Sequence, residues 1–127
     1  MDELYERSDF ISVHAPLLPS TIGLVNADAF KKMKKTAVIV NTARGPLINE
    51  KDLIKALDNN EIGGAGLDVV ETEPLPINSP LIGRDNVILA PHTAFYSVEA
   101  LEELQTKAAT DVANILSGKP AVYPITG

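Results

Sequence analysis

The strongest constraint on the fold is the alternation of short apolar runs with longer amphipathic segments. Such runs occupy 10–13, 37–40, 65–70 and 87–90. Apolar residues at successive positions are typical of strands in a parallel sheet, which is covered on both faces. Parallel strands require crossover connections, and these are usually right-handed and helical. The alternation therefore predicts βαβ units.

Helix signals stand at the ends of the intervening segments. Asn26 is expected to cap a helix over 27–34, whose C-terminal lysines suit the negative end of the helix dipole. Asn49 is expected to cap the next helix, and Asp52 follows it at the spacing of a capping box. These signals predict one helix after each of the first two strands.

The last third of the chain carries the longest helix signal. Ser97 is expected to cap this helix, and Gly118 and Pro120 are expected to end it. An apolar stripe runs along it, formed by Ala100, Leu101, Leu104, Ala108, Val112 and Ile115. A short helix at 2–7 completes the predicted elements.

The predicted fold class is α/β: a partial Rossmann-type, doubly wound parallel sheet of about four strands with helices on both faces. A complete dinucleotide domain has about six strands and a glycine-rich loop, G-x-G-x-x-G, after the first. No such loop follows a strand here, because Gly64-Ala65-Gly66 leads into a strand. We therefore expect 1–97 to be the C-terminal half of such a domain and 98–127 to be a C-terminal helix and tail.

Composition argues against several classes of function. The balance of 11 basic and 17 acidic residues, −6 in total, argues against a nucleic-acid partner. The chain has no cysteine, so it has no thiolate metal site, and no metal-ligand spacing is present. No apolar run approaches the ~18 residues of a membrane span, and the start does not resemble a signal peptide. We expect a cytoplasmic protein without a metal, nucleic-acid or membrane partner.

Reactive side chains collect where the strands are expected to end. In parallel sheets, functional groups lie on the loops beyond the carboxyl ends of the strands, which here are 14–16, 41–45, 68–74 and 91–94. These loops hold both histidines, Arg44 among small residues, and several carboxylates. Arginine binds carboxylates with its fork of donors, and histidine moves protons. This combination suits hydride transfer to an α-keto acid.

Three ordered motifs resemble the family of D-isomer-specific 2-hydroxyacid dehydrogenases. They are Asn-Thr-Ala-Arg-Gly at 41–45, the segment 66–74 ending in Glu-Pro, and Asn-Val-Ile-Leu-Ala-Pro-His at 86–92. The resemblance covers essentially the whole chain. It implies an NAD-dependent oxidoreductase that interconverts a 2-hydroxy acid and a 2-keto acid, with a homodimeric parent enzyme. The sequence does not separate NAD from NADP.

The same resemblance implies roles for individual residues. Arg44 would bind the substrate carboxylate, His92 would be the general acid/base, and Glu73 would be its partner. Glu71 is a rival to Glu73, and only the family pattern prefers Glu73. Asp68 would contact the nicotinamide carboxamide. The full set of residues implied to line the nicotinamide and its ribose is His14, Ala15, Pro16, Leu17, Thr42, Ala43, Asp68, His92, Thr93 and Ala94.

The residues after His92 bear on the subfamily. Phe95 and Tyr96 stand where phosphoglycerate dehydrogenases tend to have glycine-rich residues. In having an aromatic pair at this place, the sequence resembles D-lactate-type dehydrogenases and the C-terminal-binding-protein corepressors. Alternatively, both rings pack against the start of the last helix. The identity of the 2-hydroxy acid is left open.

The lack of a phosphate-binding loop bears on activity. The helix N-terminus that would stabilise the cofactor's pyrophosphate is not in this sequence, so we expect little or no dehydrogenase activity from this chain alone. Such a chain would be a fragment, with Met1 either a natural start or a truncation. The alternative is a non-catalytic module, either NAD-binding or corepressor-like and protein-binding.

Overall fold

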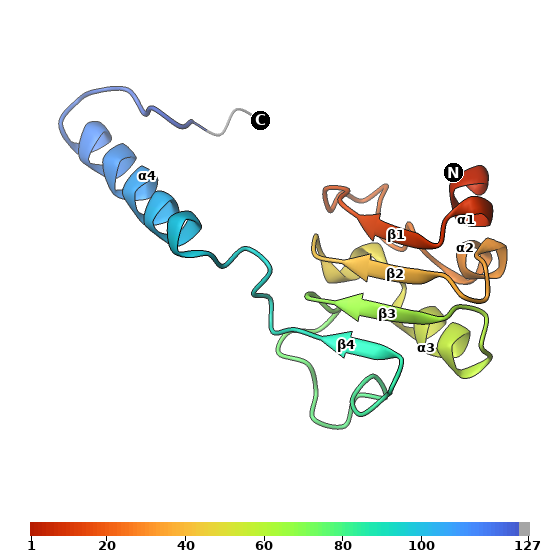
Figure 1. The fold of residues 1–127 in the computed structure, drawn as a ribbon. Coiled ribbons are helices and arrows are strands. Elements are labelled where there is room, and N and C mark those ends of the chain that lie inside the picture. Colours follow the sequence, from red (N-terminus) through yellow and green to blue (C-terminus); the bar gives the residue numbers. More distant parts are fainter. Residues whose placement is uncertain (125–127) are drawn as a thin grey trace. The chain divides into compact units, whose positions relative to one another are not determined.

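The computed structural model describes residues 1–124, and four strands in that part form one parallel sheet in the order β1-β2-β3-β4 (Figure 1). The register aligns Ile11, Ile39, Ala65 and Val87 across the sheet. The predicted Rossmann-type parallel sheet is therefore confirmed. The strands are β1 (Phe10–Val13), β2 (Val38–Asn41), β3 (Gly64–Leu67) and β4 (Val87–Leu89).

The predicted caps form in the structure. The Asn26 side chain accepts the backbone N–H groups of Asp28 and Ala29 at 3.0 and 3.3 Å, and Ser97 Oγ accepts that of Ala100 at 3.0 Å. The first capped helix ends two residues earlier than predicted, because the backbone turns extended at Met33. The helices are α1 (Asp2–Arg7), α2 (Ala27–Lys32), the 3₁₀ helix η1 (Gly45–Leu47), α3 (Glu50–Asp58) and α4 (Val98–Leu116).

The capping box predicted at Asn49 is only half formed. Asn49 Oδ1 accepts the backbone N–H of Asp52 at 3.1 Å, as predicted. The Asp52 carboxylate, however, accepts the backbone N–H of Ala27 at 3.1 Å. It does not return to Asn49, because the Asn49 N–H already donates to the Val25 carbonyl at 2.9 Å. Asp52 therefore ties the start of α2 to the first turn of α3.

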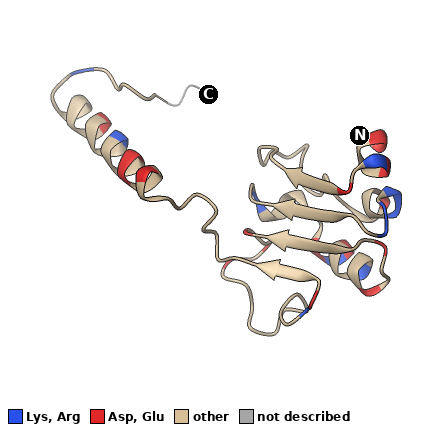
Figure 2. Cartoon of the chain, viewed as in Figure 1, with Lys and Arg blue, Asp and Glu red and all other residues tan. Residues whose placement is uncertain are grey.

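Helices cover only one face of the sheet within residues 1–94. Helix α1 packs on α2, and α2 packs on α3, so all three lie on the face where Ile39 is fully buried. On the other face, Phe10 and Ile88 are each 76% exposed. Figure 2 shows that most charged residues of this unit lie on the helices, whereas the strands carry none.

The expectation of helices on both faces is thus wrong for this unit, and the strand order explains why. Right-handed crossovers that step repeatedly in one direction place every connecting helix on the same face. Cover on both faces requires a reversal of the strand order, which the order β1-β2-β3-β4 does not contain.

A second compact unit begins at Phe95, three residues before the predicted boundary, and contains α4. No described residue of α4 is buried, and its apolar stripe is exposed at Leu104, Val112 and Ile115. The predicted tail extends to residue 127, and its last three residues lie outside the described ones. None of the helices in residues 1–124 is both long enough and apolar enough to span a membrane.

Candidate active site

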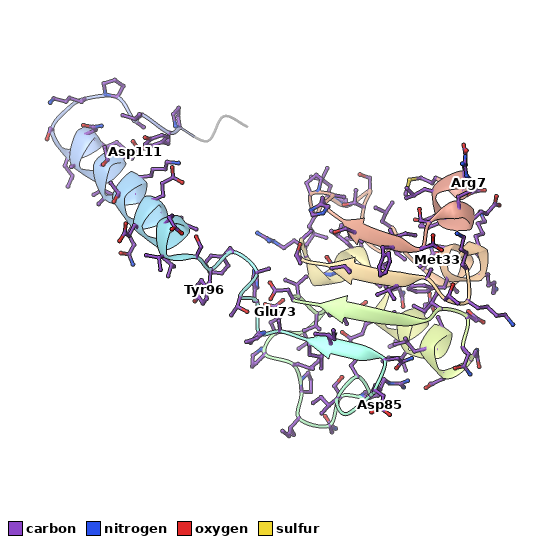
Figure 3. All side chains as sticks on the ribbon, in the orientation of Figure 1. Arg7, Met33, Glu73, Asp85, Tyr96 and Asp111 are labelled. Atoms are coloured by element: carbon purple, nitrogen blue, oxygen red, sulfur yellow. The ribbon has the colours of Figure 1, made fainter. Side chains whose placement is uncertain are left out.

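The candidate site lies on the loops that leave the carboxyl ends of the four strands. β3 ends at Leu67 rather than at the predicted residue 70, so Asp68 is the first residue of its loop. Glu73 lies farther along this loop, beyond the carboxyl edge of the sheet (Figure 3). The peptide bond between Glu73 and Pro74 is cis.

The loop after β2 presents Arg44 through Asn41, the last residue of that strand. The Asn41 side chain is fully buried. Its Oδ1 accepts the backbone N–H of Ala43 at 3.0 Å, and its Nδ2 donates to the Arg44 carbonyl at 2.9 Å. The Arg44 side chain is exposed, and Nη1 donates to the Ala43 carbonyl at 2.7 Å. Asn41 therefore fixes the loop from which the guanidinium projects.

His92 is paired with Glu73, not with Glu71. His92 Nδ1 and Glu73 Oε2 are 2.8 Å apart, and the two side chains are 43% and 39% exposed. Glu73 Oε1 also accepts the backbone N–H of Val70 at 3.3 Å. The hydrogen bond from His92, and then that from Val70, hold the pKa of the Glu73 carboxyl below its usual 4.5. Glu73 is therefore ionised at neutral pH.

Glu71 has a different set of contacts. Its Oε1 accepts the backbone N–H of Glu50 at 2.9 Å, and Glu50 Oε2 accepts the backbone N–H of Glu71 at 3.2 Å. Glu50 is the first residue of α3, so Glu71 satisfies one of the helix's unpaired N–H groups. The two acids that the sequence could not separate are thus separated by their contacts.

Asp68 holds the loop that carries His92. Its carboxylate accepts the backbone N–H of Thr93 at 2.7 Å and that of Ala94 at 3.0 Å. Its carbonyl accepts the backbone N–H of His92 at 2.8 Å. Asp68 is only 7% exposed, and these charge-assisted bonds offset the cost of burying its carboxylate.

Two large cavities in the described part of the chain are lined by these loops. One of ≈ 570 Å³ is lined by Asp68, Glu73 and His92, together with apolar residues such as Leu75 and Leu89. Apolar walls around a few convergent polar groups are typical of small-molecule sites. The second, of ≈ 480 Å³, is lined by His14, Ala15, Pro16, Leu17, Ala43 and Arg44.

The structure thus groups the predicted residues in two sets. Arg44 lines a different cavity from His92 and Glu73. Thr42, Thr93 and Ala94 are not among the lining residues of either cavity. The His14 ring is hydrogen-bonded to Ser12 Oγ at 2.7 Å. The sequence interpretation gave Asn41 no role, although its amide directly after an apolar run was a signal for one.

Comparison with known proteins adds family information to this geometry. Residues 1–94 match the family model described as "D-isomer specific 2-hydroxyacid dehydrogenase, NAD binding domain". A glyoxylate reductase from Thermofilum pendens is 47% identical over 94% of this chain and 35% of the relative. A D-lactate dehydrogenase from Lactiplantibacillus plantarum is 44% identical over 82% of this chain and 35% of the relative.

A solved structure shows the same fold. The crystal structure of D-lactate dehydrogenase with NAD⁺ from Lactobacillus jensenii aligns with a TM-score of 0.88 at 29% identity. The alignment covers 99% of this chain and 42% of that one. The chain spans about a third of the length of the curated relatives it matches.

Proposed function

The chain belongs to the D-isomer-specific 2-hydroxyacid dehydrogenase family, and from this we propose that it supplies the catalytic edge and the nicotinamide side of an NAD site. The reaction is the interconversion of a 2-hydroxy acid and a 2-keto acid. The observation that carries the proposal is the His92–Glu73 pair at 2.8 Å, which lines an apolar cavity at the carboxyl edge of the sheet.

His92 is the proton-transfer group in this proposal. Because Glu73 is ionised, it can only accept a hydrogen bond, and His92 Nδ1 must therefore carry the proton between them. Proton exchange with the substrate's hydroxyl or carbonyl oxygen then uses the other ring nitrogen, Nε2. Glu73 fixes the tautomer and stabilises the imidazolium formed when His92 takes up a proton.

Arg44 binds the substrate carboxylate in this proposal. One of its guanidinium nitrogens is held by the Ala43 carbonyl, which restrains the side chain. A guanidinium has five N–H donors in a fixed fork, so donors remain for a two-point contact with a carboxylate. The exposed position of Arg44 leaves these donors accessible to a ligand.

The residues present fit the nicotinamide end of NAD. Asp68 lines the larger cavity with a buried carboxylate, which is a suitable acceptor for a carboxamide N–H. The second cavity is lined by short side chains and by the 14–17 loop, which suits a ribose. When bound, NAD supplies the hydride acceptor. No G-x-G-x-x-G turn opens a helix in this sequence, so its residues offer no site for the pyrophosphate.

Binding of cofactor fragments tests this division. We expect nicotinamide mononucleotide to perturb the NMR signals of His92 and Ala43, and AMP, which lacks both the nicotinamide and its ribose, to leave them unchanged. Arg84, whose guanidinium is paired with Asp58, serves as a reporter away from the site. Binding of AMP as tight as that of NAD, or no response to any nicotinamide compound, would contradict the proposal.

Turnover tests the reaction itself. We expect little NADH oxidation by this chain alone with glyoxylate, hydroxypyruvate or pyruvate. In an assembly that also supplies a phosphate-binding half, we expect turnover that His92→Gln abolishes. We further propose a cytoplasmic, homodimeric parent enzyme without nucleic-acid or membrane partners. Protein or corepressor binding with no turnover in the complete assembly would favour the non-catalytic alternative.

The 2-hydroxy acid itself is not assigned. The relatives named glyoxylate reductase and D-lactate dehydrogenase have nearly the same sequence identity to this chain, 47% and 44%. The Phe95 and Tyr96 rings contact each other edge-on, with centroids 4.3 Å apart. Comparing the three keto acids in the turnover assay would separate these substrates.

A further inference from the structure

The turn that carries His92 has an uncommon backbone conformation, and Asp68 binds it. His92 has a φ of +54°, in the left-handed region that few non-glycine residues adopt, Asn, Asp and His more often than the others. Such a conformation persists only when surrounding contacts impose it. Asp68 accepts hydrogen bonds from three backbone N–H groups of this turn.

Asp68 binds three consecutive N–H groups. Its carbonyl accepts from His92, and its two carboxylate oxygens accept from Thr93 and Ala94, all between 2.7 and 3.0 Å. The Asp68 backbone is itself fixed, because its N–H donates to the carbonyl of buried Asn41 at 3.0 Å. The turn is therefore tied to the core of the sheet through one residue, by its backbone carbonyl and by its carboxylate.

The direction of the His92 ring depends on this turn. Glu73 reaches His92 from the loop after β3, and its other carboxylate oxygen is held by the Val70 N–H. With Glu73 fixed in this way, the 2.8 Å contact forms only if the His92 backbone is also fixed. Releasing the residues that follow His92 would let it return to a common φ and turn its ring away.

We infer that Asp68 is a positioning residue, whose carboxylate holds the left-handed turn at His92 and so orients the imidazole toward Glu73. This role is additional to the carboxamide contact implied by the family. The hydrogen bonds from Thr93 and Ala94 use one lone pair on each Asp68 carboxylate oxygen. A carboxylate offers about four such sites, so acceptor sites remain for the carboxamide. The catalytic importance of this role rests on the proposed function, but the orientation itself does not.

The tautomer of His92 provides a direct test. The chain has only two histidines, so their imidazole ¹⁵N signals are readily distinguished. At a pH where the rings are neutral, we expect the Nδ1–H form of His92 in the unmodified chain. In Asp68→Ala we expect this form to be lost, and the amide exchange of Thr93 and Ala94 to become at least about tenfold faster.

Asp68→Asn is the second variant, in case Asp68→Ala does not fold. The amide keeps one acceptor oxygen but places an NH₂ group where an oxygen stood, so at least one of the two bonds is lost. Glu73→Gln should change the His92 tautomer in the unmodified chain and should have no further effect in the Asp68→Ala background.

Two controls separate positioning from general loss of structure. His14, which is bonded to Ser12, should keep its signals in every Asp68 variant. Asp85→Asn makes the same chemical change at an exposed aspartate before β4, away from the carboxyl edge (Figure 3), and should leave His92 unchanged.

The inference is overturned if a folded Asp68 variant retains the Nδ1–H form of His92. It is equally overturned if amide exchange at both Thr93 and Ala94 is unchanged, because their hydrogen bonds to the Asp68 carboxylate would then not exist in solution. The measurement needs no cofactor or substrate, so its failure is distinguishable from a failure of the proposed dehydrogenase function.

Discussion

At the scale of single residues, polar side chains hold the backbone of the loops that form the site. Asn41 closes the loop that presents Arg44, Glu71 caps the start of α3, and Asp68 holds the turn at His92. In each case a polar side chain, buried at Asn41 and Asp68 and exposed at Glu71, satisfies N–H groups for which the local backbone provides no partner. The exposed groups Arg44 and His92 depend on the buried Asn41 and Asp68 for their placement.

The Glu73–His92 pair makes a pH-dependent contribution to stability. The pKa of Glu73 is lower in the folded chain than its ordinary 4.5. The contribution is therefore present above pH 4.5 and is lost as the pH falls through the folded pKa. Both groups are partly exposed, so we expect Glu73→Gln to cost about 0.5 kcal/mol at neutral pH.

Urea unfolding of the unmodified chain and of Glu73→Gln over a pH series measures this contribution. The difference in unfolding free energy should shrink toward zero well below pH 4.5. A difference that is constant across the acid range would show that Glu73 stabilises the fold in some other way.

At the scale of elements, the loops after β2 and β3 are in close contact through Gly45. A Cβ atom at this position would lie 1.9 Å from the Val70 carbonyl oxygen, so no side chain fits without moving backbone. We expect Gly45→Ala to destabilise the fold by about 3 kcal/mol or more, as measured by chemical denaturation. It should also shift the NMR signals of Arg44, the neighbour of Gly45 in the chain.

Gly66→Ala is the matched control for this prediction. A Cβ atom there would meet Val40 Cγ2 at 3.7 Å and Val40 Cγ1 at 3.9 Å, which is ordinary van der Waals contact. We expect a change of less than about 1 kcal/mol. Similar losses for both variants would mean that glycine is needed for a reason other than the close approach at Gly45.

A carboxylate on α4 binds the backbone of the segment that follows the helix, as Asp68 binds the turn at His92. Asp111 accepts the backbone N–H groups of Val122 and Tyr123 at 2.7 and 3.0 Å, and Lys107 Nζ lies 5.3 Å from the centroid of the Tyr123 ring. We expect Asp111→Ala to accelerate amide exchange at Val122 and Tyr123 by about tenfold. Glu102→Ala, a change at an exposed acid on the same helix, should leave both amides unchanged.

At the scale of the whole molecule, the sheet has one apolar face without helix cover in residues 1–94. Phe10 and Ile88 are 76% exposed there, and β1 lies at the edge of the sheet. Exposed apolar patches and unpaired strand edges favour association. The α/β unit should therefore self-associate through this face at high concentration.

Phe10→Lys tests this expectation. We expect the variant to reduce association, measured by light scattering, while unfolding free energy changes by less than about 0.5 kcal/mol. Ile39→Val on the buried face is the control, and it should cost about 1 kcal/mol without altering association. A large loss of stability in Phe10→Lys would mean that Phe10 is covered in solution.

Much of this organisation follows from sequence because it is local. Apolar runs and caps such as Asn26, Asn49 and Ser97 depend on neighbours in the chain, and they predicted the elements nearly to their ends. The rule that parallel strands place functional groups at their carboxyl ends then located the loops that carry Arg44 and His92.

Only the tertiary structure decided which groups meet. Local chemistry does not decide which of Glu71 and Glu73 meets His92, because their contacts to Glu50 and His92 span 21 and 19 residues of chain. The placement of all three covering helices on one face depends on the strand order, which hydrophobic patterning does not encode. The sequence thus determined the elements and the chemistry at one sheet edge, whereas long-range packing determined the partners of each side chain there.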